Sequence, residues 1–133
     1  MKSLAKKNSP RKRLVNKLDR ICSLYWRKKV KYCVCCGSPE NLQLGHIFSR
    51  ISYSTRWDHE EEGNCTVQCA GCNYKHEYHA YTLYSWYIGR YGIDKFEALE
   101  SRYKRHRKYS NQDLEDLYNL IKEKYDKEEE GEY

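Results

Sequence analysis

Cys33-Val34-Cys35-Cys36 and Cys69-Ala70-Gly71-Cys72 are the two stretches of this 133-residue chain that decide its fold. Each contains a Cys-x-x-Cys turn, and such a turn places both of its sulfur atoms on one side of a tight bend. Structural zinc sites use four thiolate or imidazole ligands arranged as a tetrahedron. We therefore expect one structural Zn²⁺ ion with a closed coordination shell, bound by Cys33, Cys36, Cys69 and Cys72.

The sequence leaves two alternatives to this ligand set. Cys35 is adjacent and could replace one ligand by a shift in register, although Cys33 and Cys36 have the same spacing as the second pair. A disulfide framework is the other alternative, but seven is an odd number of cysteines, and the basic N-terminus lacks the apolar segment of a secretory signal. We therefore expect a cytoplasmic protein, because a reducing compartment favours thiolate–metal sites over disulfides.

The composition indicates a small and polar domain. Only 39% of the residues are hydrophobic and 33% are charged, so we expect a thin core that a bound metal would reinforce. Residues 1–31 hold twelve Lys or Arg against the single acid Asp19, which is the charge distribution of a nucleic-acid contact. We expect a basic flexible arm at 1–13, one zinc-stapled domain at 14–125 and an acidic tail at 126–133. No apolar run is long enough to cross a bilayer, so no membrane contact is expected.

The hydrophobic pattern predicts an α+β fold. Apolar residues recur at helical spacing from Leu14 to Trp26, and this first helix would present cations on its outer faces. Two short strands are expected at 43–48 and 65–68, paired antiparallel across a polar loop at 49–63. The second Cys-x-x-Cys turn follows the second strand directly. Cys22 and Cys65 are expected to be buried.

The second half of the chain predicts only helices. A helix is expected from Asn73 to a stop at Gly92, with a stripe of aromatic residues that we expect to lie in the core rather than to serve as a base-stacking platform. The stripe consists of Tyr74, Tyr78, Tyr81, Tyr84, Ile88 and Tyr91. Two further helices are expected to open with capping boxes, at Asp94 with Glu97 and at Ser110 with Asp113.

The insert between the two cysteine turns has polar residues next to the ends of its expected strands. His46 ends the first expected strand, Asn64 precedes the second, and Asn73 follows the last zinc cysteine at a helix start. Arg50 and Arg56 lie in the loop between the strands. A neutral imidazole near pH 7 can accept the proton of an attacking water, and arginine is suited to bidentate phosphate contacts.

This layout resembles the ββα-metal (HNH) nucleases, and within them the phage NinG/Rap family of recombination endonucleases. The motifs that carry the resemblance are the first Cys-x-x-Cys turn, Gly45-His46, Arg56-Trp57, Asn64 and Gln68-Cys69-Ala70-Gly71-Cys72-Asn73. The likeness extends over about residues 30–125 and is looser in the C-terminal half. It implies a small zinc-stapled ββα-metal core with flanking α-helices.

The resemblance implies roles for these residues. His46 would be the general base, Asn64 would orient it by hydrogen bonding, and Asn73 would bind a catalytic Mg²⁺ or Mn²⁺ ion. Many HNH nucleases have an acid or histidine where this chain has Gly45, so binding of the metal by His46 itself is an alternative. Further groups that could complete the metal shell are Asp58, His59, His76, Glu77 and His79, with Glu77 and His76 preferred to Asp58 and His59.

The expected function is a metal-dependent DNA endonuclease that leaves 5′-phosphate and 3′-hydroxyl ends. By resemblance, its substrate would be branched or recombining phage DNA in the host cytoplasm, and a nickase on the same scaffold is an alternative. The expected phosphate contacts are Arg50, Arg56, Arg11, Lys12, Arg13 and Lys17. Two other classes remain open: a non-catalytic zinc-containing nucleic-acid-binding module, and a small phage protein that acts on a host protein. Either a monomer or a dimer is compatible with the sequence.

Overall fold

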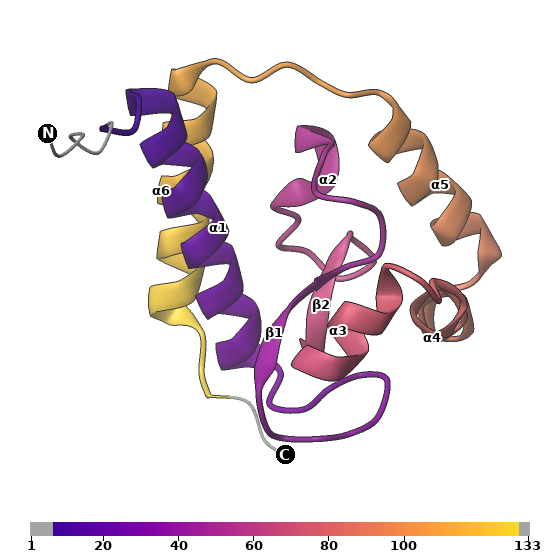
Figure 1. Ribbon diagram of the computed structural model, residues 1–133. Coiled ribbons are helices and arrows are strands. Elements are labelled where there is room, and N and C mark those ends of the chain that lie inside the picture. The colour runs from indigo at the N-terminus through magenta and orange to yellow at the C-terminus, as the bar shows by residue number, and fades with distance from the viewer. Residues whose placement is uncertain (1–6, 131–133) are drawn as a thin grey trace, which may run out of the picture.

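The computed structural model describes residues 7–130, which fold into helices around one two-stranded antiparallel sheet (Figure 1). This mixed architecture agrees with the expected α+β class. None of the helices in this range is long and apolar enough to cross a membrane. In chain order the elements are α1 (Pro10–Lys29), β1 (Leu42–His46), α2 (Tyr53–Arg56), β2 (Cys65–Cys69), α3 (Ala70–His76), α4 (Tyr81–Tyr91), α5 (Ile93–Lys104) and α6 (Asn111–Lys127).

Helix α1 begins earlier than the sequence pattern indicated. The Ser9 hydroxyl accepts a hydrogen bond from the Lys12 amide, and Pro10 occupies the first turn, where its missing N–H costs nothing. The expected flexible arm at 1–13 is therefore wrong for residues 10–13, which are helical. Residues 1–6 of that arm lie outside the described part of the chain.

The two strands pair antiparallel, as expected, with Leu42 opposite Cys69 and His46 opposite Cys65. The first strand is one residue longer at its start than predicted and stops at His46 rather than at residue 48. The loop at 49–63 is not wholly irregular, because it contains the single turn α2. The hairpin places the start of β1 and the end of β2 beside the second cysteine turn, which continues directly into α3.

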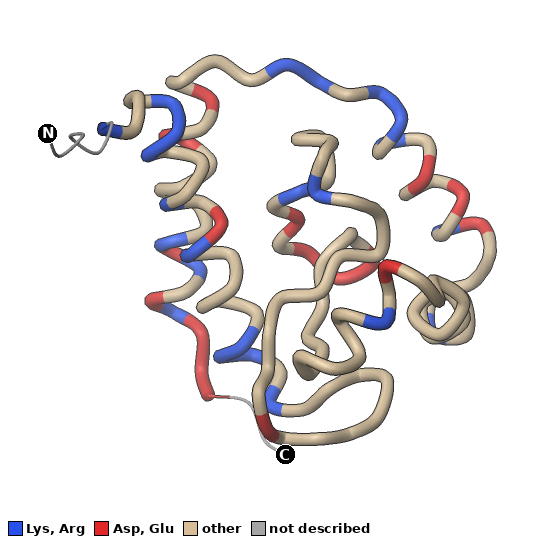
Figure 2. The backbone as a smooth tube through the Cα atoms, viewed as in Figure 1, with Lys and Arg blue, Asp and Glu red and all other residues tan. Residues whose placement is uncertain are grey.

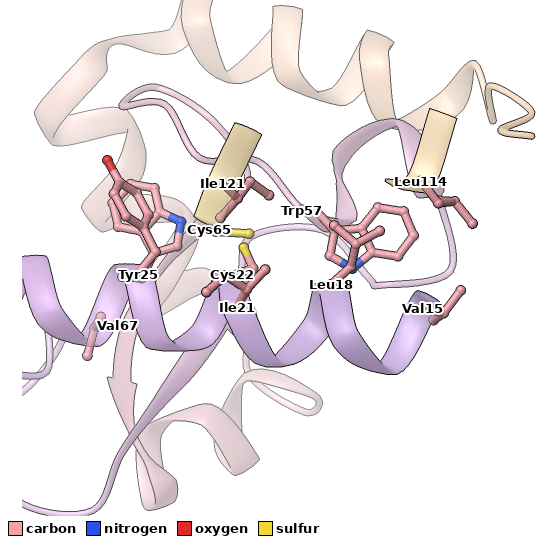
Figure 3. Close-up of a cluster of buried hydrophobic side chains, with 11 residues drawn as sticks. Val15, Leu18, Ile21, Cys22, Tyr25, Trp57, Cys65, Val67, Leu114 and Ile121 are labelled. Atoms are coloured by element: carbon pink, nitrogen blue, oxygen red, sulfur yellow. The ribbon is translucent and has the colours of Figure 1, made fainter. Parts of the chain in front are cut away.

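The main core lies between α1, α6 and one face of the hairpin. Helices α1 and α6 run side by side and parallel (Figure 1), with Lys28 donating to the Tyr125 carbonyl near their C-terminal ends. Figure 3 shows side chains of α1 pointing toward Ile121 and Leu114 of α6, with Trp57 and Cys65 among them. Fully buried aliphatic side chains of this kind contribute about 1.5–3 kcal/mol each.

The C-terminal helix confirms one capping box and shortens the expected acidic tail. The Ser110 hydroxyl accepts from the Asp113 amide and the Asp113 carboxylate accepts from the Ser110 amide. The helix then runs to Lys127, so the tail expected at 126–133 starts two residues later. In that tail the Glu130 carboxylate pairs with Lys31. Residues 131–133 are not described.

The helix expected from Asn73 to Gly92 is two helices. α3 ends at His76, a short turn follows, and α4 begins at Tyr81. Gly92 ends α4 as expected, with a φ of 94° that favours glycine. The capping box predicted at Asp94 with Glu97 is wrong, because α5 starts at Ile93 with Gly92 as its cap and no side-chain cap bond.

The expectation that the tyrosine stripe is core is wrong for its first three members, whereas Tyr84 and Tyr91 pack against a core. Tyr74, Tyr78 and Tyr81 are 64%, 66% and 80% exposed. The second core, on the other side of the hairpin, is built instead from Leu83, Tyr87 and Leu99 with Ile47 and Phe48, and Tyr84 packs against it.

Candidate functional site

The four expected zinc ligands form one cluster. The sulfur atoms of Cys33, Cys36, Cys69 and Cys72 all lie within 4.8 Å of one another. Among residues 7–130, these four side chains form the group that could hold a metal ion. The sulfurs of Cys36 and Cys69 are 3.7 Å apart. Sulfurs bound to one tetrahedral zinc at about 2.3 Å lie about 3.8 Å from each other. The cluster therefore has the dimensions of a four-cysteine site that could hold a structural metal such as zinc.

The backbone around the cluster favours thiolate sulfur. Burial raises the pKa of Cys33, but the amides of Cys69, Cys36 and Cys35 outweigh it and lower that pKa to about 7. Burial and then the neighbouring sulfurs raise the pKa of Cys72. Four thiolates in so small a volume need a cation between them, because like charges at this separation repel strongly. The other three cysteines are free thiols, and no disulfide forms within residues 7–130.

Cys35 is outside the cluster, which favours the ligand pair Cys33 and Cys36 over the register alternative. Its sulfur accepts a hydrogen bond of 3.5 Å from the Gln68 side-chain amide. Cys22 and Cys65 are buried in the main core, as expected (Figure 3).

A cleft with a volume of about 860 Å³, which we call the α1–α3 cleft, opens between α1, the end of β1 and α3. It brings together residues that are far apart in the chain. The predicted site residues that line the α1–α3 cleft are His46, Arg50, Asn73, His76 and Glu77.

His46 ends β1 with its ring held in one tautomer. Its Nε2 lies 2.9 Å from the Arg56 carbonyl oxygen. A carbonyl only accepts, so Nε2 carries the proton and Nδ1 carries the lone pair. Burial, the largest influence, lowers the pKa of His46 to about 4. The imidazole is therefore neutral at pH 7 and can accept a proton at Nδ1.

Asn64 does not touch the His46 ring, contrary to the expected orienting bond. Its side chain is fully buried and pairs with the backbone of Phe48, accepting from the amide at 2.8 Å and donating to the carbonyl at 2.9 Å. Its own carbonyl accepts from the Ile47 amide. Asn64 thus fixes the chain directly after His46, while the Arg56 carbonyl orients the ring.

Arg56 is not a free phosphate contact, because it is bound to Asp19. Its Nε and Nη2 donate to the two carboxylate oxygens at 3.0 and 2.7 Å. Burial raises the pKa of Asp19, but hydrogen bonds from Arg56 and Trp57 outweigh this and lower it. The ion pair joins α1 to α2 and so holds the Arg56 carbonyl against His46. Arg50, by contrast, is exposed on the rim of the cleft.

α3 presents three possible metal-binding groups to the cleft. The Asn73 amide donates to the Gln43 side-chain oxygen at 2.9 Å, which leaves Asn73 Oδ1 as a free acceptor. His76 donates from Nε2 to the Ile47 carbonyl at 2.9 Å, and its buried Nδ1 has no hydrogen-bond partner among the described residues. Glu77 is exposed and forms no salt bridge within residues 7–130. Unpaired oxygen and nitrogen acceptors are suitable ligands for a divalent cation.

The weaker candidates for the metal shell lie elsewhere. The Asp58 carboxylate pairs with Arg102 and accepts from the Asn64 amide, and burial raises its pKa. His59 lies against the Trp57 carbonyl. His79 borders a separate cavity of about 200 Å³ beside Cys35. None of the three lines the α1–α3 cleft.

Gly45 has a packing reason to lack a side chain. A Cβ atom built there would lie 2.4 Å from Gln68 Oε1 and 3.0 Å from the next two atoms of that side chain. Gln68 is buried, and its Oε1 has no partner within the described residues. A side chain at position 45 would thus collide with Gln68.

The cations of α1 mostly face α6 or solvent rather than the cleft. Arg11 donates to Asn111, Lys17 pairs with Glu115 at 3.8 Å, and Arg13 donates to the Asn8 carbonyl. Lys12 is exposed. None of the four lines the α1–α3 cleft, although Lys and Arg recur along the whole of α1 (Figure 2).

Sequence reasoning missed the contribution of α1 to the cleft. Asp19 and Ser23 line it, and Arg27 donates to the Ser23 hydroxyl at 3.0 Å. Asp19 was visible as the one acid of a basic segment, and its spacing of four from Ser23 places both on one helix face. No feature of the sequence indicated that Gln43 would contact Asn73.

Comparison of this chain with protein-family models, curated proteins and solved structures gives no match.

Proposed function

We propose that this protein is a metal-dependent DNA endonuclease of HNH type. The observation that carries the proposal is that His46, Asn73 and Glu77 line one cleft on a strand–strand–helix unit. His46 is neutral there, and the lone pair of its Nδ1 is available to accept a proton. Hydrolysis of a phosphodiester requires a base for the attacking water and a positive charge near the phosphate oxygens.

The four-cysteine cluster is proposed to hold Zn²⁺ with a purely structural role. Four thiolates close the coordination shell and leave no position for water or substrate. The cluster joins the turn before β1 to the first turn of α3, and Asn73 follows Cys72 directly. Zinc would thus fix the helix that carries Asn73 and Glu77 against the strand that carries His46.

The catalytic Mg²⁺ or Mn²⁺ ion would be held by Asn73 Oδ1 and the Glu77 carboxylate, with the unpartnered Nδ1 of His76 as a third candidate. Such an ion supplies Lewis-acid stabilisation of charge on the phosphate and the leaving oxygen. Gln43 keeps the Asn73 oxygen turned outward. This shell needs no ligand from position 45, and it leaves His46 available as the base.

The remaining groups of the cleft are proposed to position the DNA backbone. His46 Nδ1 takes the proton of the attacking water, while the Arg56 carbonyl keeps the ring from rotating. Arg50 lines the cleft and Arg27 donates to Ser23 of its lining, and both suit phosphate binding. Products with 5′-phosphate and 3′-hydroxyl ends, and a branched or recombining DNA substrate, follow from the resemblance to the NinG/Rap family.

The test is relaxation of supercoiled plasmid, with and without Mg²⁺ or Mn²⁺. We expect metal-dependent nicking that Glu77→Gln reduces at least about 100-fold, since a lost charged ligand of a catalytic ion typically costs this much. The matched control is Glu97→Gln, which removes an exposed carboxylate from α5. It should nick at the wild-type rate.

The same experiment separates the proposal from a non-catalytic nucleic-acid-binding module. A protein that shifts plasmid and four-way-junction DNA in a gel, but cuts neither with any divalent cation, would be such a module. Nicking that survives Glu77→Gln unchanged would remove Glu77 from the metal shell and leave Asn73 and His76 as its candidates.

A further inference from the structure

Three exposed tyrosines stand beside the α1–α3 cleft and have no role in the proposed chemistry. Tyr74, Tyr78 and Tyr81, which we call the tyrosine ledge, are 64%, 66% and 80% exposed. Two of the three belong to the turn and helix start between α3 and α4. Exposed large aromatic side chains that gather in one short segment mark binding surfaces more often than chance.

The tyrosine ledge is continuous with the cleft. Tyr74 is itself a lining residue, and so are Ala80 and Tyr84, which flank Tyr81 along the chain. The rings of Tyr74 and Tyr78 lie 5.5 Å apart at 59° to each other, so they are not stacked face to face, and both side chains remain about two-thirds exposed. The ledge therefore offers open ring faces directly beside the proposed reaction site.

The charges around the tyrosine ledge suit a phosphate backbone. Lys75 lies between Tyr74 and Tyr78 in sequence, is exposed and pairs with no acid within residues 7–130. Glu77, the proposed metal ligand, is the one acid in the same segment. Arg50 stands on the rim of the same cleft. Aromatic rings alternating with cations are the pattern by which proteins bind single strands, because each base can stack on a ring while its phosphate meets a cation.

We propose that the tyrosine ledge binds unpaired nucleotides of a DNA strand by stacking their bases on the rings. In a duplex the base faces are already occupied by neighbouring bases, so only unpaired nucleotides can use the ledge. The proposal rests on the proposed function for the identity of the ligand as DNA. The tyrosine ledge would restrict the substrate of the proposed endonuclease to DNA that has unpaired bases next to the phosphate in the cleft.

The test compares three fluorescent probes at one fixed salt concentration without added divalent cation: a thymidine oligonucleotide, an abasic oligonucleotide of equal length and a duplex. The wild-type protein should bind the thymidine probe at least about ten-fold more tightly than the abasic probe. Replacing all three tyrosines by leucine should abolish this ratio, since leucine keeps apolar area but has no ring. Replacement by phenylalanine should preserve it.

The control is Tyr32→Leu, which changes a tyrosine that is 42% exposed and lies before the first cysteine turn. It should keep the wild-type ratio. Should the triple leucine variant fail to fold, the single variant Tyr81→Leu, at the most exposed of the three rings, should still lower the ratio at least about two-fold.

A thymidine-to-abasic ratio that is unchanged in the leucine variants would overturn the proposal. Self-association of the wild type in sedimentation velocity that the leucine variants abolish would also overturn it, because the ledge would then be an interface between two copies. The ratio is measured on His46→Ala as well, without cleavage. A wild-type protein that never nicks plasmid but keeps the thymidine-to-abasic ratio would therefore contradict the endonuclease and not the ledge.

Discussion

His46 illustrates how one backbone contact sets the chemistry of a residue. Imidazole chemistry and the HNH-like motif indicated His46 as a candidate base, but its tautomer depends on the Arg56 carbonyl ten residues later. That carbonyl is in turn held by the ion pair of Arg56 with Asp19 on α1. The local part of this arrangement could be predicted from the sequence. The ion pair could not, because nothing in the local pattern states which loop α1 packs against.

The lowered pKa of His46 predicts a pH dependence of stability. Its pKa falls from the usual 6.5 to about 4 in the folded chain, so the unfolded chain binds the proton first. The contribution of the neutral His46 to the free energy of unfolding is therefore fully present above pH 6.5, and it is lost as the pH falls from 6.5 toward 4. Urea unfolding at pH 7 and pH 5 should show that His46→Gln removes about 2 kcal/mol from the difference in the free energy of unfolding between the two pH values.

His59→Gln is the control for that measurement, since His59 lies outside the cleft on a surface loop. It should leave the pH difference as in the wild type. A pH difference that is equally large in His46→Gln would show that the imidazole is not held neutral.

At the scale of elements, the hairpin and α3 position the candidate site. The sequence predicted the pairing of the two strands, but it did not predict the break after α3. Strand pairing follows from local alternation and from the cysteine turns at its end. The break at His76 has no glycine or proline to mark it, and it coincides with tertiary contacts of His76 to the Ile47 carbonyl and to the Tyr84 ring. Periodicity across the break therefore predicted a buried stripe where the structure has exposed rings.

The fit between Gly45 and Gln68 gives a prediction for the hairpin. Gly45→Ala should lower the free energy of unfolding by about 1–3 kcal/mol, because the new Cβ collides with the buried Gln68 side chain. In a Gln68→Ala background the same change should cost less than half as much. A double-mutant cycle by urea unfolding measures this coupling.

Gly71→Ala is the matched control, because a Cβ there meets nothing within 4 Å. It should be neutral or slightly stabilising. An equal cost of Gly45→Ala in both backgrounds would mean that Gln68 is not the reason for glycine at this position.

For the whole molecule, the four-cysteine cluster joins two regions with separate cores. One core lies between α1, α6 and the hairpin, and the other lies under α4 and α5. The cysteine ligands could be predicted from spacing alone, since each turn is local and the pair of turns is rare. That α1 and α6 would pair in parallel, with residues about 100 positions apart in contact, could not.

Loss of the metal should therefore unfold the chain rather than only inactivate it. Cys36→Ser should abolish binding of one zinc per chain and lower the free energy of unfolding by at least about 3 kcal/mol. Cys35→Ser should retain the zinc, because its sulfur lies outside the cluster. Elemental analysis and thermal unfolding of the purified variants measure both effects. Zinc lost from Cys35→Ser and kept by Cys36→Ser would reverse the ligand assignment.

The most direct test of the central claim is the single-turnover rate of plasmid nicking by wild type and His46→Ala with Mg²⁺ or Mn²⁺. Both proteins are first shown to hold one zinc per chain and to unfold at similar temperatures. The account predicts metal-dependent nicking by the wild type that falls by at least about 100-fold in His46→Ala, as removal of a general base requires. Equal nicking by both folded proteins would contradict it.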